Sequence, residues 1–256
     1  SRSKTLTMRT KRGPARTPLY LLAVTLPAHA ATINVTAGNL TELRDAITTA
    51  NGNGQDDTIV LPSGSTFAIT TPDNGVNGLP VVTSRITIQG NDSTIQRTGA
   101  TEFRLIEVSG TGDLTLDRLT VKGGRVTFAA SRDGGAGIRV AGAGKITLTN
   151  ATVTQNACNG AQCQGGGILL VDNQSPIATL TDSTVSMNSA NTGGGISLNH
   201  NDQSLVLTRT TVSDNTANEG GGIATNGQDT VTITDSTITG NSVSQGTSGG
   251  ALGGGA

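Results

Sequence analysis

Aspartate and arginine side chains recur at one position of the repeated segments, where they could take part in acid–base chemistry. Asn150, Asp182, Arg209 and Asp235 each precede a short threonine-rich segment, about one repeat apart. Carboxylates around an arginine suggest polysaccharide cleavage, which needs an acid of raised pKa or a strong base beside a metal-held substrate carboxylate. The alternative is structural, because opposite charges can simply alternate along a stack of repeats, where exposed pairs add little stability. The pattern favours the structural explanation and leaves Asp182, Arg209 and Asp235 as catalytic candidates.

A second set of aspartates lies in turns that the repeats align. These are Asp172, Asp202 and Asp229, near Asn173, Asn201 and Asn226. Calcium favours clustered oxygen ligands, but the chain lacks a Gly-Gly-x-Gly-x-Asp repeat, and acidic turns are ordinarily solvated loops. We therefore expect no cofactor, with Ca²⁺ as the one metal left open. His200 lies in the same turns without a neighbouring Ser or Cys nucleophile, so a catalytic triad is not indicated.

The two cysteines, Cys158 and Cys163, stand inside one turn that is four residues longer than its counterpart at 188–193. A metal site would need further thiolates or histidines nearby, and the sequence has none there. In an exported protein such a close pair predicts a local disulfide that pins the turn.

Outward threonines predict a roughly regular grid of hydroxyl groups. Its members are Thr147, Thr149, Thr179, Thr181, Thr232 and Thr234. Flat threonine grids can order water, as in ice-binding solenoids. Asp182, Arg209 and an uneven third row around Thr208 interrupt the regularity, so ice binding is kept as a minor alternative.

The elements that position these residues are repeats. Gly-Gly-Gly-Ile occurs at 165–168, 193–196 and 220–223, and looser copies occur at 134–138 and 249–252. The apolar residue of each copy recurs after 30, 28, 27 and 29 residues. Self-similarity at a near-constant period is typical of a solenoid.

Within each repeat, apolar residues alternate with small polar ones, as in 145–149, 204–208 and 230–234. This period of two, with much Val, Ile and Thr, predicts three short strands per repeat. One such unit cannot bury its apolar row alone, but stacked coils can, because each strand pairs with its equivalent about 4.8 Å away. The expected fold is an all-β parallel β-helix, in which Ile168, Ile196 and Ile223 form one column.

A column of asparagines is also expected at the end of the third strand. Its members are Asn156, Asn188, Asn215 and Asn241. Stacked amides can hydrogen-bond each other and the turn backbone, so we interpret the column as structural.

The first 30 residues have the pattern of a secretory signal peptide with a start at Met8. A basic run is followed by the apolar segment 19–26 and by Ala28-His29-Ala30. Removal of six basic residues leaves 11 basic and 18 acidic residues, a net charge of about −7 instead of −1. An acidic exterior with few aromatic residues argues against nucleic acid as a partner, and no later apolar run is long enough to span a membrane.

One amphipathic helix is expected, from Asn39 to Ile47, with Asn39 as its cap and Glu42 reaching back. Residues 51–54 end it. We expect residues 31–54 to cover the first coil, residues 55–256 to form the β-helix, and 249–256 to begin a new coil that stops. Irregular segments at 71–82 and 125–137, the latter with Arg125, Arg132 and Asp133, are expected to leave the helix as candidate binding loops.

The segments 43–47, 57–62 and 64–67 resemble the opening of bacterial secreted right-handed β-helix proteins, whose Cys-Ser-Leu-Arg-Glu-Ala helix precedes an Asp-Thr-Ile-x-Leu strand. Thr41 and Glu42 stand at that motif's first Cys and Ser, so any disulfide made by that Cys is absent. The Gly-Gly-x-Ile and Val-x-x-Asn repeats are similar to those of polymorphic outer-membrane proteins, with Val or Ile in place of Phe. The resemblance covers residues 31–256 and implies a right-handed, pectin-lyase-like fold.

These observations predict a secreted or cell-surface, adhesin-like module that presents loops and a long β-face to glycans or partner surfaces. The alternative is a polysaccharide lyase or glycoside hydrolase of the same fold. A cleft lined by Asp, Lys or Arg would favour the enzyme, whereas a Thr, Ser and Asn surface would favour adhesion.

Overall fold

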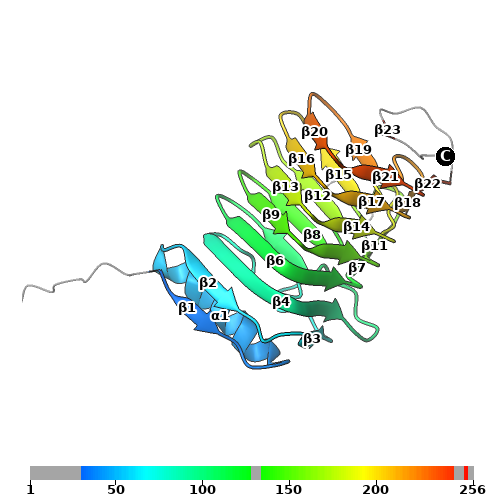
Figure 1. The fold of residues 1–256 in the computed structure, drawn as a ribbon. Helices are drawn as coiled ribbons and strands as arrows, with labels where there is room; N and C mark the ends of the chain where they lie inside the picture. Colours follow the sequence, from blue (N-terminus) through cyan, green and yellow to red (C-terminus); the bar gives the residue numbers. More distant parts are fainter. Residues whose placement is uncertain (1–29, 128–133, 245–250, 253–256) are drawn as a thin grey trace, which may run out of the picture.

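The chain winds into a solenoid in which equivalent strands of successive coils lie side by side (Figure 1). The computed structural model describes residues 30–127, 134–244 and 251–252. The strand segments are those whose Val, Ile, Leu and Thr residues alternate between the interior and the surface, as β-strands require. All strand pairs along the axis are parallel except the last, so the predicted parallel β-helix is confirmed.

The longest ladder of strands runs the length of the solenoid. Its members in axial order are β1 (Thr32–Asn34), β2 (Asp57–Val60), β4 (Arg85–Arg97), β6 (Asp113–Lys122), β9 (Lys145–Thr149), β13 (Ile177–Thr181), β16 (Ser204–Thr208) and β20 (Thr230–Thr234). The solenoid makes about seven turns.

Two further ladders complete each coil. The second contains β3 (Thr66–Ile69), the later halves of β4 and β6, β10 (Thr152–Thr154), β14 (Thr184–Ser186), β17 (Thr211–Ser213) and β21 (Thr237–Thr239). The third contains β5 (Ile106–Val108), β8 (Ile138–Ala141), β12 (Ile168–Val171), β15 (Ile196–Asn199), β19 (Ile223–Thr225) and β23 (Ala251–Leu252).

A fourth, shorter ladder follows the asparagine column, and the sequence patterns missed it. It pairs β7 (Arg125–Thr127) with β11 (Ala157–Asn159), and β18 (Thr216–Ala217) with β22 (Ser242–Val243). Single bridges at Ser189 link the two pairs. These strands are too short to show a period of two in the sequence.

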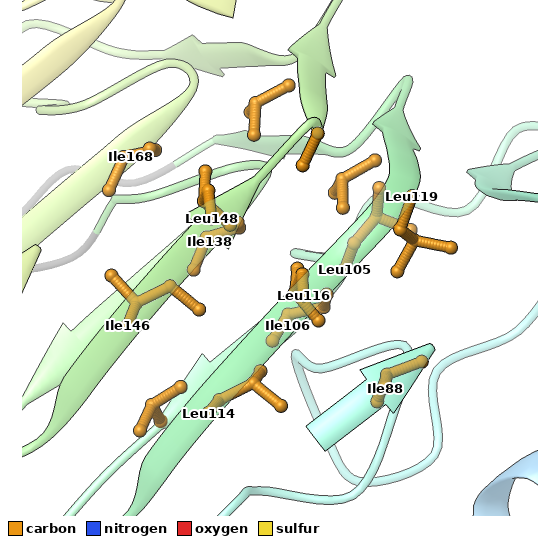
Figure 2. Close-up of a cluster of buried hydrophobic side chains, with 14 of the residues drawn as sticks. Ile88, Leu105, Ile106, Leu114, Leu116, Leu119, Ile138, Ile146, Leu148 and Ile168 are labelled. Atoms are coloured by element: carbon orange, nitrogen blue, oxygen red, sulfur yellow. The ribbon is translucent and has the colours of Figure 1, made fainter. Parts of the chain in front are cut away.

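At each inward-facing position of the coil, apolar side chains of successive coils stack into a column, and these columns form the core. Ile138, Ile168, Ile196 and Ile223 pair in register and are completely buried. Figure 2 shows part of this core, where leucine and isoleucine side chains from several coils lie between the ladders. Burying each such side chain contributes about 1.5–3 kcal/mol, so the stacked columns are the main source of stability.

The glycines before each isoleucine allow the coil to turn tightly. Gly193 has φ +64°, and a Cβ there would lie 2.5 Å from the carbonyl oxygen of Ile196. At Gly194 a Cβ would lie 2.5 Å from the carbonyl oxygen of Thr216 in the next coil. Only glycine fits both the positive φ and the close approach of backbone atoms.

The four asparagines stack as a buried amide ladder. The Oδ1 atom of Asn188 accepts hydrogen bonds from the backbone N and from Nδ2 of Asn156, at 3.0 and 2.9 Å. The second Nδ2 hydrogen of Asn188 reaches the carbonyl oxygen of Val153 at 3.0 Å. Asn215 and Asn241 repeat this arrangement, and none of the four side chains is more than 4% exposed. Every polar atom of the central amides is thereby used.

The helix α1 (Leu40–Asn53) covers the N-terminal end of the core (Figure 1). The Asn39 side chain accepts from the backbone N of Glu42 at 3.1 Å, and Gly54 ends the helix with φ +70°. Glu42 reaches back to the backbone N of Thr36 and not to that of Asn39. Leu43 and Ile47 are buried against the first strands, so the helix caps the solenoid as expected.

Of the last coil expected at 249–256, the structure describes only Ala251 and Leu252. Leu252 lies opposite Ile223, but β23 runs antiparallel to β19, so 251–252 do not continue the parallel winding. A strand that pairs by reversing direction satisfies the same edge hydrogen bonds as a further coil would. The predicted signal peptide, apart from Ala30, and the loop residues Arg132 and Asp133 lie outside the described residues.

We expect the amide ladder to carry a large share of local stability. In Asn188→Ala, the backbone N of Asn156 and the carbonyl oxygen of Val153 lose buried partners, which costs at least about 3 kcal/mol. The urea unfolding midpoint should fall accordingly. Met187→Ala, at a side chain that is 53% exposed, is the matched control and should change little. Equal midpoints for Asn188→Ala and the wild type would contradict a structural role.

Candidate functional site

The charged column lies at the corner between the first and second ladders. Asn150, Asp182, Arg209 and Asp235 all have φ between 47° and 50°, in the left-handed region. Arg209 and Asp182 form a two-pronged ion pair, with Nε–Oδ1 and Nη2–Oδ2 distances of 2.7 Å. No hydrogen bond joins Asp235 to Arg209 within the described chain. The structure therefore brings together two of the three catalytic candidates.

The electrostatics of this pair oppose acid catalysis. The hydrogen bonds from Arg209 lower the pKa of Asp182. In turn Asp182, with a smaller effect from Asp235, raises the pKa of Arg209. A general acid needs a raised pKa at its carboxyl group, so Asp182 is tuned in the wrong direction. The arrangement suits a link between adjacent coils.

The same corner holds a second ion pair that the sequence reasoning missed. Arg118, with φ +49°, contacts Asp92 one coil below, and Arg118 Nε lies 3.1 Å from Asp92 Oδ1. The available signal was the repeat itself, because Arg118 stands about one period before Asn150. Arginine seldom adopts a left-handed φ. Both corner arginines pair with an aspartate of the preceding coil, which compensates for that conformation.

In the turns proposed to bind calcium, Asp172 and Asp229 accept hydrogen bonds from different backbone groups. Asp172 Oδ2 accepts from the backbone N of Gly142 at 3.0 Å, and Asp229 Oδ1 accepts from the backbone N of Gln203 at 3.1 Å. Each carboxylate thus caps the coil below it. Across the described ranges, no group of three or more His, Cys, Asp or Glu side chains is arranged to hold a metal ion. The structure does not assemble the calcium ligands suggested by the sequence.

This turn region does contain buried polar atoms without partners. In the described part of the chain they include His200 Nε2, Gln203 Oε1 and Asp229 Oδ2. Burial raises the pKa of Asp229, and the Asp202 charge adds to the effect. Hydrogen bonds from the backbone of Gln203 and Asn226, and the charge of His200, lower the pKa of Asp229 and partly offset this rise.

The irregular segment 71–82 is fastened to its surroundings. The Arg104 side chain, only 2% exposed, donates to the carbonyl oxygen of Gly134 at 2.9 and 3.1 Å and to Asn77 Oδ1 at 3.0 Å. Arg104 also pairs with Glu107, which pairs with Arg139. Arg44 donates to the carbonyl oxygen of Gly78 at 2.8 Å. Arg104 thereby joins both segments that were expected to be binding loops.

A shallow groove lies beside the cysteines. Cys158 and Cys163 form a disulfide with a Cα–Cα distance of 5.5 Å, and both side chains are buried. The groove has a volume of about 320 Å³. Its lining comes from three coils: Cys158, Asn159, Gly160, Ala161, Ser189, Ala190, Asn191 and Asn218. None of these groups is ionisable, because the Cys158 sulfur is in the disulfide.

The disulfide turn contributes Cys158, Asn159, Gly160 and Ala161 to the lining of this groove. The backbone N of Cys158 donates to the carbonyl oxygen of Ser189 at 2.8 Å. The carbonyl oxygen of Cys163 accepts from the backbone N atoms of Asn191 and Thr192, at 3.0 and 3.2 Å. Both ends of the turn are therefore tied to the next coil, and its middle, 160–162, is exposed.

The threonine grid is more regular than the sequence suggested. Thr208 pairs in register with Thr181 and Thr234, so the row around Thr208 is regular at that position. In the neighbouring column, Val206 stands where the other coils have threonine. Over the coils from β9 to β21, the residues that alternate with the buried apolar ones align in four columns, of which the last contains two buried residues, Thr154 and Ser186. The columns are Thr147, Thr179, Val206, Thr232; Thr149, Thr181, Thr208, Thr234; Thr152, Thr184, Thr211, Thr237; and Thr154, Ser186, Ser213, Thr239. The charged corner separates the first two columns from the last two.

The comparisons agree with this architecture. A family model described as a right handed beta helix region matches residues 81–255, more than half of the chain. The chain belongs to this right-handed β-helix family. No curated protein matches the chain, and no solved structure does. Among the described residues, no helix has the length and apolar character needed to cross a membrane.

The raised pKa of Asp229 gives a pH-dependent prediction. The folded chain holds the Asp229 proton more tightly than the unfolded chain, so ionised Asp229 lowers stability above that pKa, and the penalty disappears as pH falls through it. Asp229→Asn keeps an oxygen for Gln203 and should be more stable than the wild type at neutral pH. The difference in stability between Asp229→Asn and the wild type should become smaller as the pH falls. Urea midpoints across pH measure this, with Asp214→Asn as the control; a difference that is independent of pH would contradict it.

Proposed function

We propose that this protein is an exported, adhesin-like binding module whose groove beside the disulfide turn holds glycans without cleaving them. The observation that carries the proposal is the lining of that groove, which consists of amide, hydroxyl, backbone and small apolar groups from three coils. Side-chain amides donate and accept hydrogen bonds, as sugar hydroxyls do, so they complement each other. A cavity with a few converging polar groups is the usual form of a ligand site.

The charge distribution argues against the enzymatic alternative. Cleavage of acidic polysaccharides requires cations that neutralise the substrate carboxylates, and a base or acid at the scissile bond. From residue 140 onward the sequence has two basic residues, Lys145 and Arg209, and seven acidic ones. Arg209 is already paired with Asp182. The coils that form the groove therefore offer little to bind or cleave a polyanion.

Export is supported by the first 30 residues and by the disulfide. A basic run, an apolar run and Ala-x-Ala are the parts of a secretory signal. Disulfides persist in oxidising compartments, and Cys158–Cys163 is present here. The resemblance of the repeats to bacterial surface proteins supports placement outside the cell or on its surface.

Binding without turnover is the expected outcome when the protein is incubated with polysaccharides. We expect it to be retained by one or more of them, with no new reducing or unsaturated ends above a protein-free blank. The double variant Asp182→Ala/Arg209→Ala should bind as the wild type does. Cleavage that this variant loses would instead establish a lyase or hydrolase centred on the corner column.

The threonine grid favours a second candidate function, the ordering of water at an ice surface. On each side of the charged corner, hydroxyl groups repeat about 4.8 Å apart between strands and about 6.6 Å apart along them, which makes a lattice on that side. Fifteen of the sixteen aligned positions carry Thr or Ser, as the registers show. A lattice of this kind can hold water in a fixed arrangement.

If the grid binds ice, the wild type should show thermal hysteresis. Thr181→Lys, at an inner position of the grid, should abolish most of that activity because a long charged side chain displaces the ordered water. Asn201→Lys, in an exposed turn away from the grid, is the matched control. Wild-type solutions that freeze without hysteresis would dispose of this candidate.

A further inference from the structure

The groove beside the disulfide turn carries a regular series of polar side chains along the solenoid axis. The strand bridges at Ala157, Ser189 and Thr216 place Asn159, Asn191, Asn218 and Ser244 at equivalent positions of four successive coils. Equivalent atoms in such a stack are about 4.8 Å apart. An extended ligand that lies along the axis would therefore meet one amide or hydroxyl group per coil.

Part of this series is free to bind. Asn218 Nδ2 donates to Asn191 Oδ1 at 2.7 Å, and Ser244 Oγ donates to Asn218 Oδ1. These bonds hold the side chains in fixed positions. Within the described residues, the Asn159 amide and the Nδ2 atom of Asn191 make no side-chain hydrogen bond, and both residues line the groove. Asn191 and Asn159 thus offer donors that the described part of the chain does not use.

The lining also selects by charge. None of the described lining groups is ionised. The coils that follow are acidic overall, with Asp202, Asp214, Glu219, Asp229 and Asp235 between residues 200 and 240 against one basic residue, Arg209. A polyanion would lose its hydration without meeting a counter-charge, which is unfavourable. A neutral ligand has no such cost.

We infer that the groove binds a neutral, unbranched polysaccharide whose chain lies parallel to the solenoid axis across the coils of Asn159, Asn191 and Asn218. This rests on the proposed binding function and specifies its ligand. Extended sugar chains repeat hydroxyl groups at intervals close to the coil spacing, so one sugar unit can face each amide. The disulfide turn 158–163 blocks the chain from sliding sideways.

The affinity of one groove is expected to be low. Among the described residues that line it there is no aromatic side chain on which a sugar ring could stack. Hydrogen bonds to a ligand replace hydrogen bonds to water and give a small net gain. A dissociation constant of about 1 mM for a short oligosaccharide is the consequence. Tight attachment would come from many copies on one surface, where linked binding events reinforce each other.

The test is a titration of the folded protein with oligosaccharides of increasing length, followed by NMR or calorimetry. The probes are neutral cello-, manno- and xylo-oligosaccharides, with oligogalacturonides as the acidic series. For one or more neutral series, affinity should rise up to about three sugar units, the number of coils that line the groove, and then level off. Oligogalacturonides should bind at least about tenfold more weakly.

Two variants locate the binding. Removal of 160–163 together with Cys158→Ala gives a turn of the same length as 188–193 and keeps Asn159 in register with Asn191. It should weaken neutral binding at least about tenfold. Asn159→Ala removes an amide that makes no hydrogen bond with the described residues, so it should fold normally and weaken binding about threefold. Thr181→Ala, on the hydroxyl grid, should bind as the wild type does.

The outcomes separate this inference from the proposed function. If no neutral series binds, if the acidic series binds more tightly, or if both groove variants bind as the wild type does, the inference is wrong, even though retention on another polysaccharide would leave the binding function standing. Cleavage of a bound chain would overturn the proposed function itself. Ala161→Lys provides the converse check, since a cation placed in the groove should improve oligogalacturonide binding.

Discussion

Backbone hydrogen bonds between equivalent strands of successive coils determine the position of almost every side chain in this protein. Because the strands pair parallel and in register, a residue is held directly above its equivalent one repeat earlier. Apolar residues then form continuous buried columns, and asparagines form a ladder that uses both hydrogens and the oxygen of its central amides. A single wrong residue in such a column affects two neighbours as well as itself, which makes the interior intolerant of change.

The corners of each coil impose a second constraint, a left-handed backbone conformation at a fixed position. Aspartate and asparagine tolerate it, and they occupy most of the corner positions. Two arginines occupy the others and pair with an aspartate of the coil below. Charged residues that look like a catalytic cluster in the sequence are thus explained by backbone geometry and by contacts between coils.

The repeats predicted the solenoid and the asparagine stack, while local spacing predicted the capping helix and the disulfide. Features that depend on where a segment runs in space, or on which distant segments meet, were not predictable from spacing. The extra residues at 158–163 were visible as an insertion, but the sequence does not say that this turn lines a groove together with Asn191 and Asn218. The reversal of β23 and the Arg104 bridge between two distant segments are long-range choices of the same kind. The burial of Asp229 also depends on how neighbouring turns stack, which spacing alone does not reveal.

The turn between the asparagine ladder and the glycine triplet has a consequence for how proteins of this design diversify. Its two ends are anchored to the adjacent coil, so residues added between them, as at 158–163, leave the winding of the other coils undisturbed. Length variation can therefore accumulate at this one place while the frame stays constant, much as loops vary on an immunoglobulin framework. A lineage that changes what it recognises would do so by inheriting longer or shorter turns here, without having to redesign its interior.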